Sequence, residues 1–479
     1  MTGLRHPGLI ACALWLAIAL AVAVGGGLGE GVQIAFVILV GVVSMLAAAD
    51  LAGPVRLAPP VVVLLLLGLW ASASALWAIV DPAAAIRSGM VLFALASVVV
   101  ISGRLAVNQP LRFIAVPVAV IAVACGIVGL YGAAVGEVPL AYRIEGVWRP
   151  AGPFEYPPAL AMLQVSALPL LVRFAAGAEN GWARLGGAIG LAIAATVLAL
   201  AESRLALALA AITVGVCLLG PTAAYVAPRR LRVAALVPAA VAAVSGSLLA
   251  GGLADGREGR GLGLLSLLLA AVVVAGVVSV LVRDRLARTG PSSSDRDLRP
   301  LRSQLAALIV VVALAGVAFS VTTERTGGGI EDYAGPLHGR EAQWSAALDA
   351  IAERPLRGSG AGTFYVATAA DQGKSPSLYA HSWPLEAGAE LGILGMVLVL
   401  ALYMSIAREL WRARRAPALW LIGPGVIGFL LFGLVDWQWH LTGAAALWGM
   451  LLGWELTASR GSATVAPFPT PSGLKGRSD

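Results

Sequence analysis

Charged residues are scarce in this chain. They make up 12% of its 479 residues, whereas hydrophobic residues make up 59% and the mean hydropathy is +0.87. A soluble domain usually has about 25% charged residues. The composition therefore excludes an ordinary soluble enzyme and predicts a protein whose helices lie in a bilayer.

Lysine is almost absent. Of the 33 basic residues only Lys374 and Lys475 are lysine, and the remaining ones are arginine. The net charge of +7 is spread in short arginine clusters between apolar runs, not gathered on one basic face. This distribution is typical of membrane topology signals and argues against nucleic acid as a partner.

Cysteine is rare as well, with three residues that all lie in apolar runs: Cys12, Cys125 and Cys217. No Cys-x-x-Cys pattern occurs, so the sequence predicts neither a disulfide framework nor a zinc site. We expect the three cysteines to be small buried hydrophobes, and we expect no metal or other cofactor.

Apolar runs of roughly 20 residues, the length that crosses a bilayer, recur about fourteen times. The first follows Arg5 and resembles a signal peptide, but no clear Ala-x-Ala site precedes a soluble domain, so we expect a first span. The predicted fold class is an all-α, polytopic transmembrane bundle of about 12–14 spans. The runs start near Leu9, Gly31, Pro60, Ser88, Arg112, Pro158, Arg184, Ser203, Leu231, Gly261, Gln304, Gly388, Pro417 and His440.

Basic residues predict the orientation of these spans. With a cytoplasmic N-terminus, the inner segments hold 22 basic residues and the outer segments 11, five of which lie in one long loop, Thr323–His381. Long loops carry little weight in the positive-inside rule, so the contrast is 22 against 6. We expect both termini to be cytoplasmic and the long loop to lie outside.

Composition divides the chain into five parts. The polar segment 283–303 is rich in Ser, Asp and Arg, which predicts a flexible linker, and the tail is rich in Pro, Ser and Gly, which predicts disorder. The parts are N-terminal spans (1–151), central spans with a cytoplasmic linker at 283–303 (152–323), a long extracytoplasmic loop (324–380), C-terminal spans (381–457) and a disordered cytoplasmic tail (458–479).

The long loop has two patterns of its own. Arg340 to Pro355 predicts an amphipathic helix with apolar residues at i, i+3, i+4 and i+7, namely Trp344, Ala347, Leu348 and Ile351. The glycine-rich run Gly358–Phe364 follows it. Such a run can cradle a phosphate with its N–H groups, but no predicted strand precedes it, and a tight re-entrant turn explains it equally.

Ionisable groups at the outer ends of spans are the candidates for chemistry, because such groups are costly in a membrane. His381 lies at the mouth of a span and can act as a base or a donor. Arg204 is the basic residue at its turn, where headgroups or a pair with Glu202 are alternatives. The weaker candidates for substrate binding are Glu390, His440, Asp436 and Arg149, although the aromatic surroundings of Asp436 and His440 also fit an interfacial belt.

Together these pieces resemble the O-antigen ligase and polymerase superfamily. Its ligases carry His, then Asn, Ser or Gln, then nine residues and Gly-x-x-Gly. The chain has His381-Ser382, nine residues, and Gly392-Ile-Leu-Gly395. Further likenesses are Ser203-Arg204, the pair Arg340 and Trp344, and the stretch Gly152–Leu160, which lacks two family asparagines. The resemblance covers about Gly152 to His440.

The resemblance implies a glycosyltransferase that moves a glycan from an undecaprenyl-diphosphate carrier to a glycan, lipid or protein acceptor at the outer face of the inner membrane. It implies an inverting, metal-independent reaction in which Arg204 and Arg340 hold the diphosphate. His381 would orient or deprotonate the acceptor hydroxyl, or contact the phosphate. The alternative is a transporter or flippase of lipid-linked saccharide, but no repeated halves are visible.

Overall fold

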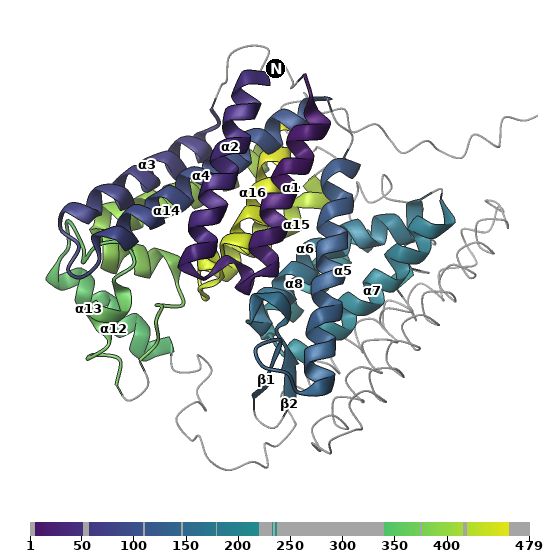
Figure 1. Ribbon diagram of the computed structural model, residues 1–479. Helices are drawn as coiled ribbons and strands as arrows, with labels where there is room; N and C mark the ends of the chain where they lie inside the picture. Colours follow the sequence, from purple (N-terminus) through teal and green to yellow (C-terminus); the bar gives the residue numbers. More distant parts are fainter. Residues whose placement is uncertain are drawn as a thin grey trace, which may run out of the picture. The chain divides into compact units, whose positions relative to one another are not determined.

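The computed structural model describes residues 5–50, 57–108, 111–144, 147–178, 180–219, 232, 235–236, 340–373, 376–414 and 419–458 (Figure 1). The chain forms two compact units. Unit 1 comprises Met1–Ile114, Gly328–Leu419 and Gly425–Thr464, and unit 2 comprises Ala115–Gly327, Trp420–Pro424 and Val465–Asp479.

Helices make up nearly all of unit 1. Its elements are α1 (Pro7–Ala23), η1 (Gly25–Gly27), α2 (Glu30–Asp50), α3 (Pro59–Ala73), η2 (Ser74–Leu76), α4 (Pro82–Asn108), α12 (Arg340–Glu353), α13 (Phe364–Thr368), α14 (Trp383–Arg412), most of α15 (Leu419–Gly433), η6 (Gln438–His440) and α16 (Thr442–Ala458).

Unit 2 is built around a buried helix. Its described elements are most of α5 (Arg112–Val135), β1 (Ala141–Ile144), β2 (Val147–Pro150), η3 (Gly152–Phe154), α6 (Pro157–Gly177), α7 (Gly181–Ala201) and α8 (Arg204–Leu219). Almost every residue of α6 is buried, and Gln164 on α6 donates from Nε2 to the Ala122 carbonyl on α5 at 2.9 Å. The antiparallel hairpin of β1 and β2 joins α5 to α6, and its four-residue strands are too short to show in a hydropathy scan.

The prediction of an all-α, polytopic membrane protein is confirmed. Within the described residues seven helices are long and apolar enough to cross a membrane, and three shorter apolar helices accompany them. Eleven of the predicted runs coincide with helices. The three runs predicted from Leu231, Gly261 and Gln304 fall almost wholly outside the described residues, as do the linker at 283–303, residues 324–339 and the tail from 459.

Two helix starts predicted from hydropathy were late. The runs expected from Ser88 and Gly388 belong to helices that begin at Pro82 and Trp383. Charged side chains at Arg87 and Glu386 interrupt the apolar pattern there. Both are partnered inside unit 1, Arg87 by Glu30 at 2.7 Å and Glu386 by His440, so the helices tolerate them.

Small residues let helices of unit 1 pack closely. A Cβ on Gly453 of α16 would lie 2.1 Å from the Val99 carbonyl oxygen of α4. Hydroxyls join the same pair of helices: Ser102 donates to the Met450 carbonyl at 2.6 Å, and Thr457 donates to the Gly103 carbonyl at 3.1 Å. Close backbone approach with interhelical hydrogen bonds is the usual way helices associate in a membrane.

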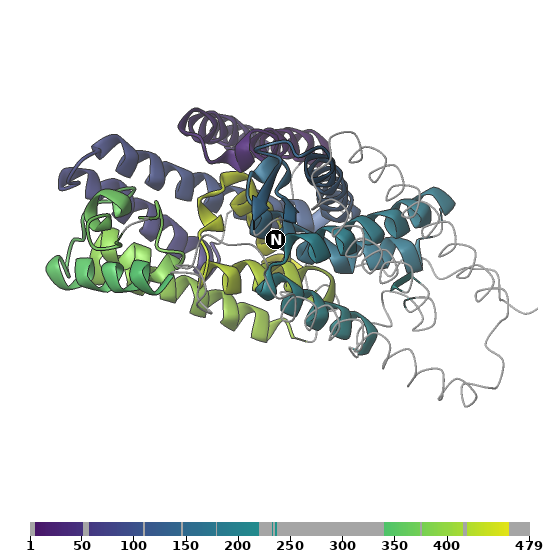
Figure 2. The same cartoon turned by 90° about the horizontal axis from the view of Figure 1, so that it is seen from below.

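The amphipathic helix predicted in the long loop is α12, and its buried face differs from the predicted one. Ala347 is fully buried in a small core with Phe364, Ala380 and Ala389, against which Ile351 packs. Leu348, predicted to share that face, is 55% exposed. Figures 1 and 2 show α12 and α13 together beside the start of α14, so this part of the loop is folded onto unit 1.

The prediction that the cysteines are buried holds for two of them. Cys125 and Cys217 are buried, whereas Cys12 is exposed on α1. α1 is apolar on every side, so hydropathy could not tell which face turns away from its neighbours.

Candidate functional site

The structure divides the seven predicted site residues between the two units. Five lie in unit 1: His381, Arg340, Glu390, His440 and Asp436. The other two, Arg204 and Arg149, lie in unit 2. Each group is described within its own unit.

His381 occupies a strained turn at the start of α14. Its φ is +51°, the left-handed region, which non-glycine residues adopt uncommonly and at a cost of about 1–3 kcal/mol. Ser382 then forms the N-cap position and Pro384 lies in the first turn, so the chain passes directly from His381 into the helix. The His381 Nδ1 atom lies 3.3 Å from the Tyr379 carbonyl oxygen. Backbone strain of this kind collects at functional sites, where the surrounding fold maintains it.

α14 is broken at Gly392, and the glycine-rich run fills the break. Gly392 has φ +70° and ψ −174° inside the helix. The N–H of Ser359 donates to the Ala389 carbonyl at 3.0 Å, and the N–H of Gly360 donates to the Glu390 carbonyl at 2.7 Å. A Cβ on Gly358 would lie 2.3 Å from the backbone carbon of Glu390. Glycine is therefore required on both sides of this contact.

The same contacts decide between the two interpretations of the run Gly358–Phe364. Its N–H groups bond within the protein: besides those of Ser359 and Gly360, that of Ala361 donates to Ser74 Oγ at 3.0 Å. Nothing in this arrangement leaves a set of N–H groups for a phosphate. The run is a tight docked turn, as the second interpretation had it.

Glu390 fixes this turn from the helix side. Its Oε1 accepts the N–H of Phe364 at 2.9 Å, and the N–H groups of Gly362 and Thr363 are offered to the same carboxylate. The residue is 5% exposed. This placement gives Glu390 an anchoring role in the fold of the loop.

Glu386, one helical turn before Glu390, is paired with His440. The Glu386 Oε1 and His440 Nε2 atoms are 2.5 Å apart, and Glu386 Oε2 accepts the N–H of Ala380 at 2.9 Å. Glu386 is fully buried, while the His440 side chain is 18% exposed. A buried carboxylate in this position is satisfied on both oxygens and meets the favourable N-terminal end of the α14 dipole.

Arg340 and Asp436 form a second pair. Arg340 Nη2 lies 3.5 Å from Asp436 Oδ2, and Asp436 Oδ1 accepts the N–H of Trp437 at 2.7 Å. Burial is the main cause that lowers the pKa of His381; the Arg340 charge lowers it further, and the Asp436 and Glu386 carboxylates oppose this. The two ion pairs and His381 therefore share one electrostatic environment at the N-terminal end of α14.

Aromatic rings enclose this environment. Tyr379 stacks on Trp437 with ring centroids 4.8 Å apart and lies 4.2 Å from the His440 ring. Trp439 also stacks on His440, with ring centroids 3.7 Å apart, and on Trp383 at 5.0 Å. Burial, together with the carboxylates of Glu386 and Glu390, raises the pKa of Tyr379, so its phenol keeps its proton. Such a cluster combines flat apolar faces with a few polar groups, as sugar-sized ligands require.

In unit 2 the two predicted arginines have different surroundings. Arg149 at the end of β2 pairs with Glu202, with 2.7 Å between Nη2 and Oε2. The pair with Glu202 that was predicted as an alternative for Arg204 is therefore made by Arg149 instead. Arg204 is the first residue of α8 and is exposed. A cation at a helix N-terminus opposes the helix dipole, so this position does not stabilise the helix and suits an anionic ligand.

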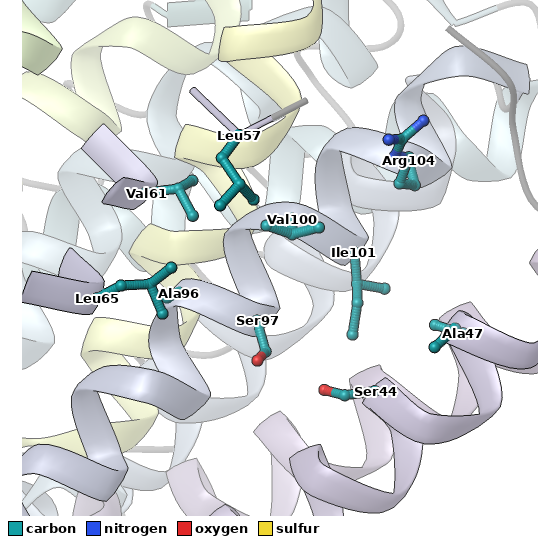
Figure 3. Close-up of a pocket in the computed structure, with 11 residues that line it drawn as sticks. Ser44, Ala47, Leu57, Val61, Leu65, Ala96, Ser97, Val100, Ile101 and Arg104 are labelled. Carbon is teal, nitrogen blue, oxygen red and sulfur yellow. The ribbon is translucent and has the colours of Figure 1, made fainter. Parts of the chain in front are cut away.

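A separate cavity of about 270 Å³ lies among α2, α3 and α4 of unit 1 (Figure 3). Its lining is largely apolar, with Arg104 at one end and the hydroxyls of Ser44 and Ser97 bonded to their own helices. None of the candidate residues lines it, so it is not the site predicted from the sequence. In the described part of the chain, no three His, Cys, Asp or Glu side chains gather as a possible metal-binding group.

Sequence reasoning missed Glu386 and Tyr379. The signal for Glu386 was present, because it is an acidic residue four positions before Glu390 in an apolar run, and both fall on one face of a helix. Tyr379 carried no signal, since its role depends on how the chain turns before α14.

Comparison with known families matches residues 189–400 to the family described as O-antigen ligase. The matched range contains Arg204, Arg340 and His381 with the complete Gly392–Gly395 pattern. The predicted resemblance is confirmed over this range, which is shorter than the expected Gly152 to His440. No curated protein matches the chain. The match indicates a glycosyltransferase-like membrane enzyme that acts on polysaccharide.

Proposed function

We propose that this membrane protein, whose residues 189–400 belong to the O-antigen ligase family, transfers a glycan from an undecaprenyl-diphosphate carrier to an acceptor. The observation that carries the proposal is the cluster at the start of α14. There His381, the Arg340–Asp436 pair and the Glu386–His440 pair lie in one environment lined by aromatic rings.

The chemistry of the transfer fits these groups. The acceptor hydroxyl oxygen forms a bond to the anomeric carbon as the bond from that carbon to the phosphate oxygen breaks. The electron pair and the developing charge go to the diphosphate, where a guanidinium stabilises them bidentately. Arg340 supplies such a guanidinium near His381. A role for Arg204 in diphosphate binding comes from the family resemblance alone.

We propose direct displacement with inversion at the anomeric carbon and with arginine in place of a metal ion. No activated nucleophile for a covalent intermediate was evident in the sequence, and the two ion pairs offer acid and base groups instead. A single displacement inverts the configuration.

The proposed location is the bacterial inner membrane, with the site on its outer face and both termini cytoplasmic. The contrast of 22 inner to 6 outer basic residues supports this orientation. Lipid-linked glycans would then reach the site from the outer leaflet, and the acceptor, whether glycan, lipid or protein, from the aqueous side.

The test is transfer by the purified protein in liposomes that contain a lipid-linked glycan and an acceptor. We expect His381→Ala, Arg340→Ala and Arg204→Ala each to lower the transfer rate by at least about 100-fold. Arg354→Ala is the matched control, because Arg354 follows the same helix, α12, and is exposed.

Undiminished transfer in all three variants would refute the site. The second candidate function is a transporter or flippase. It would be supported if the wild-type protein moved lipid-linked glycan across the bilayer and formed no glycosidic bond. The described polar groups favour the enzyme, because those of the site gather at one end of α14 and not along a path through the helices.

A further inference from the structure

His440 is held so that one ring nitrogen remains for a ligand. Its Nε2 atom faces the Glu386 carboxylate at 2.5 Å. Because an ionised carboxylate only accepts hydrogen bonds, the proton of the neutral ring lies on Nε2 and the lone pair on Nδ1. The His440 side chain is 18% exposed, whereas Glu386 is fully buried behind it.

The surroundings of His440 fix the orientation of its ring. Glu386 Oε1 lies against Nε2, and the N–H of Ala380 donates to Glu386 Oε2 at 2.9 Å. The rings of Tyr379 and Trp439 pack against the imidazole, with centroids 4.2 and 3.7 Å away. A ring that is oriented by a carboxylate through one nitrogen, and keeps its other nitrogen for a ligand, has the features of a general base.

His381 has different surroundings. Its Nδ1 atom lies 3.3 Å from the Tyr379 carbonyl oxygen, and its backbone is in the left-handed region. Burial lowers the pKa of His381 and the Arg340 charge lowers it further, while the Asp436 and Glu386 carboxylates oppose this. The two histidines of the cluster are therefore not equivalent, because a carboxylate orients the His440 ring directly, whereas a backbone carbonyl faces the His381 ring and Arg340 lies near it.

We propose that His440, positioned by Glu386, is the base that takes the proton of the acceptor hydroxyl, while His381 and Arg340 serve the diphosphate of the donor. This inference rests on the proposed function. In the step, the acceptor oxygen bonds to the anomeric carbon as the bond from that carbon to the phosphate oxygen breaks, with its electron pair remaining on the diphosphate. The hydroxyl proton moves to His440 Nδ1 and later leaves to solvent.

The experiment compares wild type with His440→Gln, His440→Ala and Glu386→Gln in liposomes, at saturating lipid-linked glycan. Glutamine keeps a donor toward Glu386 but has no basic nitrogen. We expect His440→Gln to lower kcat by about 100-fold or more with the donor KM changed less than about threefold. Glu386→Gln should lower kcat by a smaller factor, because the base remains but loses its charge partner.

Added imidazole provides a readout that a purely structural role would not move. We expect added imidazole to raise the transfer rate of His440→Ala at least about tenfold, because it can occupy the vacated space, and not to raise that of His440→Gln. His6→Gln is the matched control, since the His6 side chain is 76% exposed and pairs with Asp50, outside the cluster.

The failures of the two proposals are distinguishable. A wild-type protein that forms no glycosidic bond contradicts the proposed function itself. An active wild type with His440→Gln within about threefold of its kcat, or with a loss confined to donor KM, overturns the role of His440 and leaves the function standing. Loss of rate in His440→Ala that imidazole does not restore also overturns it.

Discussion

Replacing Gly392 by alanine should disrupt the contact between α14 and the glycine-rich turn. Its φ of +70° with ψ −174° belongs to a region that side-chain-bearing residues essentially never occupy, at a cost of about 1–3 kcal/mol. The added Cβ would also meet three backbone atoms: the carbon and oxygen of Leu356 at 2.5 and 2.6 Å and the nitrogen of Arg357 at 2.8 Å.

Backbone atoms cannot rotate away as the end of a side chain can, so this overlap adds about 1–3 kcal/mol. The free energy of unfolding should fall by about 2–6 kcal/mol in total, the sum of the two costs. If the turn instead separates from the helix, at least three backbone hydrogen bonds are lost, including that from the Ile393 N–H to the Pro355 carbonyl at 2.7 Å. Each is worth about 1 kcal/mol, which gives a loss of similar size.

The assay is thermal unfolding in detergent, followed by transfer activity at a temperature where the variant is folded. Gly41→Ala is the matched control, because Gly41 lies within α2 and an added Cβ meets nothing within 4 Å. We expect Gly41→Ala to match or exceed wild type, since alanine favours a helix by about 1 kcal/mol. Equal melting temperatures for the two variants would refute the account of the helix break.

Three further predictions concern the two units separately. The chain has only four histidines, so NMR of labelled histidine can follow His381. Its pKa should lie below the ordinary value of about 6.5, and lower still in Asp436→Asn, because this substitution removes a carboxylate that raises the pKa. A pKa at or above the ordinary value would contradict the effect of burial. Trp70→Phe should lower the free energy of unfolding by about 1 kcal/mol, because the indole N–H donates to the Leu391 carbonyl, next to the helix break, at 2.9 Å. Trp182→Phe, at an 80% exposed position, should leave it almost unchanged in the same melting assay. A double-mutant cycle on Arg149 and Glu202 should give a coupling energy of about 0.2–1 kcal/mol, since the pair is partly exposed, and no coupling would mean that the pair does not form.

Hydropathy predicted the helices well because the bilayer requires every backbone group to be satisfied within a helix. It failed where a helix begins with charged residues, as at Arg87 in α4 and Glu386 in α14. It also could not show the break at Gly392, because glycine in an apolar run fits close helix packing and a kink equally well. Hydropathy could not predict the hairpin of β1 and β2, because its strands are only four residues long.

The sequence selected candidate residues for the site but could not predict how they pair. Spacing and position at the outer ends of spans selected His381, Asp436 and His440. That His440 turns toward Glu386 and Asp436 toward Arg340 depends on the turn before α14 and on η6, which have no periodic pattern. Where side chains point in irregular segments cannot be predicted from periodicity.

A single coupled measurement on purified protein in liposomes tests the proposed glycosyl transfer directly. Release of undecaprenyl diphosphate and formation of glycosidic bonds are followed together, for wild type, Arg340→Lys and Arg354→Lys. We expect wild type to release one diphosphate per bond formed. We also expect the rate to fall at least about tenfold in Arg340→Lys, because lysine lacks the bidentate fork, and to stay unchanged in Arg354→Lys. Wild-type protein that releases no diphosphate, or an Arg340→Lys variant that transfers as fast as wild type, would contradict the proposed glycosyl transfer at this site.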